Sequence, residues 1–243
     1  MIYELGSSGI LPPKIEKYQV GILIVGQCKV IGVPVIVMSK MLRQCRKPTG
    51  WLGRQVARGM NISHSKLTDW GLKHVSIGKG FTILDIGCGG GGTISKLASI
   101  AKEGKVCGID YSDDSVSISQ KRNKKLMEAG RVEIRQGSVS NMPFADGMFD
   151  LVSAIETHYF WPNLAVDMKE VLRVLKAGGE FILLGGEYSG GKFDKRNAKW
   201  VKLGNITYHT ADGLRQLFSD AGFADVAVIE EYERGWICAM GKK

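Results

Sequence analysis

The sequence predicts an α/β fold: a doubly wound, mostly parallel sheet with helices on both faces and a C-terminal antiparallel hairpin. Two observations carry this prediction. From residue 81 onward, short apolar runs alternate with amphipathic segments of helical length, which is typical of parallel strands joined by helices. A glycine-rich stretch directly follows the first apolar run, as it does where a strand turns into a helix beside a nucleotide. The chain has 243 residues, enough for one such domain and a smaller extension.

The elements of the main domain, expected over residues 79–243, follow one another in a regular order. The predicted strands cover residues 81–86, 105–110, 132–134, 149–154 and 181–184. The predicted helices begin at about Thr93, at the N-cap Ser112, at Asn163 and after the N-cap Thr210; Gly178 and Gly179 end the third, after residue 175. Residues 224–243 are expected to form two strands joined by a turn near residues 233–235.

Composition and charge limit the class of protein. Apolar residues make up 44% of the chain and charged residues 23%, which excludes a disordered or collagen-like chain. The net charge of +9 permits contact with nucleic acid or an anionic membrane without establishing either. Much of this charge lies in short runs such as residues 121–125, which suit a solvated helix face. We therefore expect neither nucleic acid nor a membrane as partner, and leave the oligomeric state open.

The cysteines argue for a reduced, cytoplasmic setting. They are odd in number and widely spaced, and no two have the CxxC spacing of a zinc site or a disulfide framework: Cys28, Cys45, Cys88, Cys107 and Cys238. We therefore expect no metal site.

The N-terminal 78 residues differ from the rest of the chain. Residues 20–38 form its most apolar stretch, but Gln27 to Lys29 interrupt it, so each half is shorter than the roughly 20 residues of a membrane-spanning helix. Its Val and Ile content favours two short strands around a turn. We expect residues 1–40 to be an accessory segment or to arise from an upstream start codon; a membrane anchor is the less favoured alternative.

Residues 41–78 are basic and helical in pattern, and we interpret them as a lid or entrance segment of the main domain. Leu67, Trp70, Leu72 and Val75 recur at the spacing of one buried helix face.

The strand, glycine loop and helix at residues 81–93 predict a nucleotide site. Glycines let a ligand approach the main chain, and the start of the helix offers unpaired N–H groups. Asp110 ends the next strand, where a carboxylate can accept hydrogen bonds from a ribose diol. Gly87, Gly89 and Gly92 satisfy the dinucleotide pattern GxGxxG, but this match alone is weak.

Asp85 argues against a nicotinamide dinucleotide. It lies two residues before the first glycine, where a dinucleotide strand is usually apolar. A carboxylate there can meet the cationic amino group of an amino-acid moiety, which NAD lacks.

At this point the residues resemble a known family. LDIGCGGGG (residues 84–92) looks like motif I of the class I S-adenosylmethionine-dependent methyltransferases, and GIDYS carries the acidic residue of motif II at Asp110. RQGSVSNMPFADGMFDLVSAIETHYFWPN and EVLRVLKAGGEFILL are similar to the segments that follow in the family. The resemblance implies a seven-stranded Rossmann-like sheet, S-adenosylmethionine as cofactor and methyltransferase activity. The closest likeness is to the small-molecule branch that includes ubiquinone/menaquinone-type C-methyltransferases.

The resemblance also implies roles for individual residues. Asp85 and the loop backbone at Gly87, Cys88 and Gly89 would hold the methionine part of the donor. The ribose and adenine would be contacted by Asp110, Tyr111, Ser138 and Val139, although the family often has Asp where Ser138 stands. Glu156 and Thr157 would line the methyl-donor end.

Methyl transfer from a sulfonium is an in-line displacement, so a base is needed only where the acceptor arrives protonated. His158 and Tyr159, which follow Glu156, are the best base candidates; as an alternative, residues 158–161 form an aromatic wall of the acceptor site. His64 is a weaker candidate, and Glu187 and Tyr188 are placed to contact substrate.

We conclude from the sequence that the chain methylates a small-molecule acceptor. Residues 155–158 read Ile-Glu-Thr-His, where enzymes that methylate the amino groups of bases or glutamine carry a motif of the Asn-Pro-Pro-Tyr type. The alternatives are an RNA or protein methyltransferase that uses the basic N-terminal region, and a nicotinamide-dependent oxidoreductase.

Overall fold

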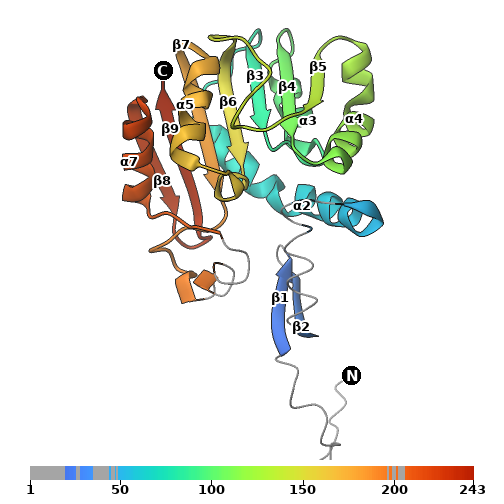
Figure 1. Ribbon diagram of the computed structural model, residues 1–243, viewed down its shortest axis with the longest axis vertical. Coiled ribbons are helices and arrows are strands. Elements are labelled where there is room, and N and C mark those ends of the chain that lie inside the picture. Colours follow the sequence, from blue (N-terminus) through green and yellow to red (C-terminus); the bar gives the residue numbers. More distant parts are fainter. Residues whose placement is uncertain are drawn as a thin grey trace, which may run out of the picture.

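The computed structural model describes residues 20–25, 28–34, 44, 47, 49–195, 197–198, 201 and 206–243, and it confirms the predicted fold class (Figure 1). Its main feature is a seven-stranded sheet with the order β5-β4-β3-β6-β7-β9-β8. The strands are β3 (Thr82–Ile86), β4 (Lys105–Asp110), β5 (Val132–Gln136), β6 (Phe149–Ile155), β7 (Leu175–Gly185), β8 (Ala224–Glu231) and β9 (Trp236–Lys242). Within this sheet β9 is antiparallel to both of its neighbours, and the pairs from β5 to β7 are all parallel.

Helices cover both faces of the sheet, and each face has its own core. On one face α3 (Gly92–Ile100) and α4 (Asp113–Glu128) pack against residues such as Ile83. On the other face α5 (Leu164–Val174) and α7 (Ala211–Ala221) pack against residues such as Leu84. Consecutive strand residues serve opposite cores because their side chains alternate across the sheet.

Three of the four predicted helix starts, at Ser112, Asn163 and Thr210, are confirmed by side-chain caps. The Ser112 hydroxyl accepts the Ser115 N–H at 3.4 Å, and the Thr210 hydroxyl accepts the Gly213 N–H at 3.0 Å. Such caps satisfy N–H groups that have no partner within the first helical turn.

The boundary expected at Gly178 and Gly179 is wrong. The helix already ends at Val174, and both glycines lie inside β7, which begins at Leu175. Leu175 is extended and pairs with Phe149 on β6. A Cβ at Gly179 would lie 3.0 to 3.2 Å from three carbonyl oxygens. Gly179 therefore allows a close approach between neighbouring strands, and it does not end a helix.

The N-terminal region contains the two short strands that were predicted. β1 (Val20–Val25) and β2 (Cys28–Pro34) pair antiparallel in a sheet separate from the seven-stranded one. Residues 1–19 and 35–43, which belong to the expected accessory and lid segments, and Cys45 lie outside the described residues. No helix among the described residues is long and apolar enough to cross a membrane.

The helix expected in the lid segment is present as α2 (Gly50–Gly71), followed by the 3-10 helix η1 (Leu72–His74). Leu67 is buried, and Trp70, Leu72 and Val75 are half-buried against the same core, as the spacing predicted. Figure 1 shows α2 lying across the end of the sheet where β3 and β4 finish.

Three contacts hold α2 in this place. The Gly50 N–H donates to the Asp114 carboxylate on α4 at 2.7 Å. Lys96 on α3 forms an ion pair with Asp69, and its ammonium donates to the Ser65 carbonyl at 3.3 Å.

Candidate active site at the carboxyl ends of the strands

The residues predicted to bind the donor meet at the carboxyl edge of the parallel strands. The glycine loop follows β3, Asp110 ends β4, and Glu156 follows β6, and β3 lies between the other two strands. In open α/β sheets ligands bind at this edge. The strand order therefore brings together side chains that lie up to about 70 residues apart in the sequence.

The glycine loop has the backbone that its composition predicts. Gly87, Gly89 and Gly91 all have positive φ angles, of 71°, 51° and 76°. The Gly87 and Cys88 N–H groups both donate to the Ile109 carbonyl, at 2.8 and 3.0 Å, which ties the loop to β4. A Cβ at Gly87 would collide with Thr157 at 2.5 Å, whereas a Cβ at Gly89 would meet only one atom, at 4.0 Å. The space that a ligand can approach is thus at Gly89.

Asp110 holds the loop from the side of β4. Its carboxylate accepts the Gly89 N–H and the Ser112 N–H, each at 2.9 Å. Burial raises the pKa of Asp110, and these two hydrogen bonds offset part of that rise. Each oxygen keeps a lone pair beyond these bonds, so the carboxylate can still accept ribose hydroxyls as the sequence predicted.

Asp85 is the most enclosed carboxylate of the site. It is 2% exposed, and the Ser153 hydroxyl donates to it at 2.7 Å from the paired position on β6. Burial raises the pKa of Asp85 to about 7, Ser153 lowers it, and Asp110 adds a smaller increase. At neutral pH this carboxyl is therefore poised between its two protonation states. The sequence did not point to Ser153, because only the strand register places it opposite Asp85.

The predicted adenine contacts lie at the ends of β4 and β5. The Tyr111 ring is 39% exposed, and the Lys47 ammonium lies 5.7 Å from its centroid. Ser138 is exposed, and its hydroxyl accepts the Ser140 N–H at 3.3 Å. Val139 is buried in the core. Tyr111 is therefore partly exposed at this edge beneath the Lys47 ammonium, and Ser138 is engaged in its own turn.

Glu156 is the centre of a cluster at the end of β6. Its backbone has a φ of 61°, which is uncommon for a residue with a side chain and often marks a functional position. One carboxylate oxygen accepts the Gly186 N–H, and the other accepts the Tyr159 hydroxyl. His64 of α2 lies 4.0 Å from the second oxygen. The cluster joins the ends of β6 and β7 to the lid segment.

The Tyr159 hydroxyl donates a hydrogen bond to the Glu156 carboxylate in this cluster. Burial and the Glu156 carboxylate hold the pKa of the Tyr159 phenol well above its ordinary value. The phenol therefore stays protonated and orients Glu156. Tyr208 packs edge-on against its ring, at 5.6 Å between centroids.

His158 packs beside this polar cluster and is itself deeply buried. It is 2% exposed, and its Nδ1 has no hydrogen-bond partner among the described residues. Burial, with a smaller contribution from His209, lowers the pKa of His158 to about 3. An imidazole so enclosed and so weakly basic is poorly suited to take a proton from an acceptor. Its ring packs on Tyr159 at 4.6 Å between centroids, as in the alternative in which residues 158–161 form a wall.

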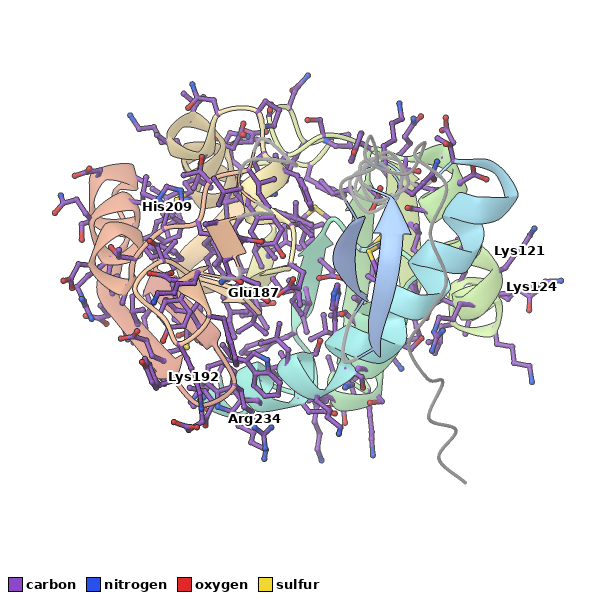
Figure 2. All side chains as sticks on the ribbon, turned by 90° about the horizontal axis from the view of Figure 1, so that it is seen from below. Lys121, Lys124, Glu187, Lys192, His209 and Arg234 are labelled. Carbon is purple, nitrogen blue, oxygen red and sulfur yellow. The ribbon has the colours of Figure 1, made fainter. Side chains whose placement is uncertain are left out.

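The two further candidates after β7 lie in different surroundings. Tyr188 is 2% exposed within the core, and burial is the main reason that its pKa rises to about 12. Glu187 contributes to raising the pKa of Tyr159 and so lies near the Glu156 cluster. Figure 2 looks onto the molecule from the side of α2 and labels Glu187 together with His209.

Among the described residues, no group of three or more His, Cys, Asp or Glu side chains could hold a metal ion. Cys88, Cys107 and Cys238 are free and buried.

Comparisons with known proteins agree with this geometry. A family described as "Methyltransferase domain" matches residues 84–183, which run from β3 to β7. The chain is 27% identical over 188 residues to a demethylmenaquinone methyltransferase of Geobacillus sp., covering 68% of this chain and 80% of that protein. It is 33% identical over 104 residues to a fatty-acid O-methyltransferase of Mycolicibacterium smegmatis, but this match covers only 43% of this chain and 36% of the other.

Among solved structures, a geranyl diphosphate C-methyltransferase from Streptomyces coelicolor, in complex with Mg²⁺, geranyl diphosphate and S-adenosylhomocysteine, has the same fold. The TM-score is 0.64 at 16% sequence identity, and the alignment covers 81% of this chain and 85% of that one. The glycine loop, the two buried carboxylates, the strand order and these likenesses agree. Residues 84–183 therefore match a methyltransferase-domain family, and the chain is similar in sequence and fold to class I S-adenosylmethionine-dependent methyltransferases.

Proposed function

We propose that this chain transfers the methyl group of S-adenosylmethionine to a small, partly apolar acceptor, and that Glu156 takes the acceptor's proton where one must leave. The observation that carries the proposal is the Glu156 cluster beside the glycine loop. The relatives reported above are named for acting on a quinone precursor and a fatty acid, both small molecules with large apolar parts. The nicotinamide and macromolecular alternatives have no support from these comparisons.

The residues fit this donor. Asp85 offers a buried carboxyl for a cationic amino group, and Asp110 has free lone pairs for a diol. The open side of Gly89 admits the ligand to the main chain. The donor supplies an activated methyl group on a sulfonium when it is bound. The protein's part is then to position the acceptor and exclude water. Such positioning can lower the activation free energy by several kcal/mol.

Glu156 is favoured as the base for three reasons. Its side chain is largely enclosed at 14% exposure. Tyr159 and the Gly186 N–H fix both of its oxygens in place. His158 and Tyr159, the other two candidates, have pKa values shifted away from proton acceptance at neutral pH. His64 of α2 lies 4.0 Å from the same carboxylate and is itself partly exposed.

We further propose that residues 41–78 form the lid or entrance segment of this site and that residues 1–40 are accessory. The place of α2 across the carboxyl edge supports the first part (Figure 1). The buried free thiols support our expectation of a reducing, cytoplasmic setting. We propose neither nucleic acid nor a membrane as partner, because the relatives reported above are named for small-molecule acceptors.

Calorimetric titration with S-adenosylmethionine, S-adenosylhomocysteine and NADH tests the donor. We expect micromolar binding of the first two and no NADH signal; tight NADH binding would contradict the proposal. An acceptor screen by mass spectrometry, which detects a gain of one methyl group, then tests the reaction.

On an acceptor that loses a proton, Glu156→Gln tests the base. We expect a loss of turnover of about 10²- to 10⁴-fold with little change in donor affinity. Glu103→Gln is the matched control, because Glu103 is exposed and distant from the cluster. Full turnover in Glu156→Gln would leave Glu156 a structural role only.

A further inference from the structure

Helix α4 buries a polar face against the glycine loop. Ser115, Ser119 and Asn123 recur every four residues along it and are at most 2% exposed. Lys121 and Lys124 project from the opposite face into solvent (Figure 2). A helix that covers a sheet normally buries apolar side chains, and burying polar ones costs free energy unless they are hydrogen-bonded. The contacts of this face therefore indicate what it does.

Asn123 makes the decisive contacts. Its Nδ2 donates to the Gly91 carbonyl at 3.1 Å and to the Ser119 carbonyl at 2.9 Å. Its Oδ1 accepts the Ser95 hydroxyl of α3 at 2.7 Å, which fixes the orientation of the amide. One Nδ2 hydrogen bond and one Oδ1 site are thus directed at the turn from the glycine loop into α3, and the other Nδ2 hydrogen bond ties the amide to its own helix.

Gly91 is enclosed by this face. It has a φ of 76° and is the N-cap of α3. A Cβ there would lie 2.4 Å from the Ser119 hydroxyl and 2.5 Å from the Asn123 amide. The Gly91 N–H in turn donates to the Cys88 carbonyl at 2.9 Å, so the position of Gly91 sets the path of the loop between them.

The glycine loop is thus held from two sides. Asp110 of β4 accepts the N–H of Gly89, and Asn123 of α4 donates to the carbonyl of Gly91. A loop with three glycines at positive φ has many accessible conformations when it is free, and ordering it on ligand binding would cost affinity. Contacts that order it beforehand remove that cost.

We propose that Asn123 is a positioning residue for the methyl donor: through Gly91 it holds the glycine loop in the conformation that binds S-adenosylmethionine. The inference rests on the proposed donor site. Asn123 itself need not touch the donor. Ser95 supports the same carbonyl, because its hydroxyl lies within hydrogen-bond distance of both the Asn123 amide oxygen, at 2.7 Å, and the Gly91 carbonyl, at 3.1 Å.

The test compares Asn123→Leu with wild type, using S-adenosylhomocysteine as the calorimetric probe. Leu has the same branched shape, although it is bulkier, and it has no hydrogen-bonding groups, so we expect a dissociation constant at least about tenfold higher. Ser115→Ala is the matched control: it lies on the same buried face, and its hydroxyl has no hydrogen-bond partner among the described residues. We expect this control to bind within twofold of wild type.

Amide hydrogen exchange separates positioning from general destabilisation. In Asn123→Leu we expect faster exchange at Gly89 and Gly91, with unchanged protection in β3 and β4. If Asn123→Leu does not fold, Ser95→Ala decides, with an expected loss of about threefold in affinity. A folded Asn123→Leu, or Ser95→Ala, that binds the probe as wild type does would overturn the inference. Absence of binding by wild type would instead overturn the proposed donor site.

Discussion

Asp85 and Asp110 are both buried carboxylates at the ends of adjacent strands, but their partners differ. Asp110 accepts two backbone N–H groups, which stabilise its charged form. Asp85 accepts a single hydroxyl, from Ser153, and its pKa rises to about 7. The charge of Asp85 therefore changes near neutral pH.

Donor affinity is expected to depend on pH through Asp85. If only the carboxylate binds the donor's amino group, which stays cationic below about pH 7.7, affinity should rise up to roughly 20-fold from pH 5.5 to 7.5. Asp85→Asn should bind more weakly at pH 7.5 and show a flat profile. Titration calorimetry at several pH values measures both; a flat wild-type profile would contradict the assignment.

The same shift predicts how stability changes with pH. Between about pH 4 and 7 folded Asp85 keeps a proton that the unfolded chain has released, so stability should fall as pH rises, by up to about 1.4 kcal/mol per pH unit. Chemical denaturation of wild type and Asp85→Asn isolates this contribution. The difference in their free energies of unfolding should change across that window in favour of the Asn variant as pH rises.

Two glycines of the loop should respond differently to alanine. Gly89→Ala places a methyl group in the open space beside the main chain, and we expect a folded protein with strongly reduced donor affinity. Gly91→Ala would collide with Ser119 and Asn123, and we expect lost stability. Gly130→Ala is the control for both, since Gly130 has a φ of 71° but no neighbour within 4 Å. It should lose about 1 kcal/mol of stability and no affinity.

At the scale of elements, α2 is held to the main domain by close packing at its C-terminal end. A Cβ at Gly71 would lie 2.3 Å from the side chain of Leu184, which is fully buried on β7. The helix and the strand therefore approach as closely as a glycine permits. This contact, together with the Lys96–Asp69 ion pair, places His64 near Glu156.

Gly71→Ala should therefore destabilise the protein by about 1–3 kcal/mol, although alanine is the better helix former. Leu184→Ala should lower the stability of the Gly71→Ala variant by less than it lowers that of wild type. The smaller side chain at position 184 makes room for the methyl group at position 71. Gly80→Ala, with nothing within 4 Å, should be nearly neutral. Chemical denaturation measures these free energies of unfolding. If Leu184→Ala destabilises wild type and Gly71→Ala equally, the packing argument is refuted.

At the scale of the whole molecule, the described contacts of the donor site come from residue 47 onward. β1 and β2 pair with each other in a separate sheet and add no strand to the main one. A chain that begins at residue 41 should thus bind S-adenosylhomocysteine within about twofold of the full chain. A larger loss of affinity would show that residues 1–40 are part of the site and not accessory.

The sequence by itself determined the strand–glycine loop–helix unit, the carboxylates at Asp85 and Asp110 and the order of strands and helices, because each is written in residues that are neighbours along the chain. It misplaced the start of β7, since strand pairing with Phe149 extends Leu175 beyond the end of the helix. Only the tertiary structure decided which distant side chains support the site. Ser153 meets Asp85 through parallel register, Asn123 meets Gly91 through helix packing, and His64 meets Glu156 through the place of α2. The tertiary structure also decided that His158 is buried, because its burial follows from contacts between segments that no local pattern shows.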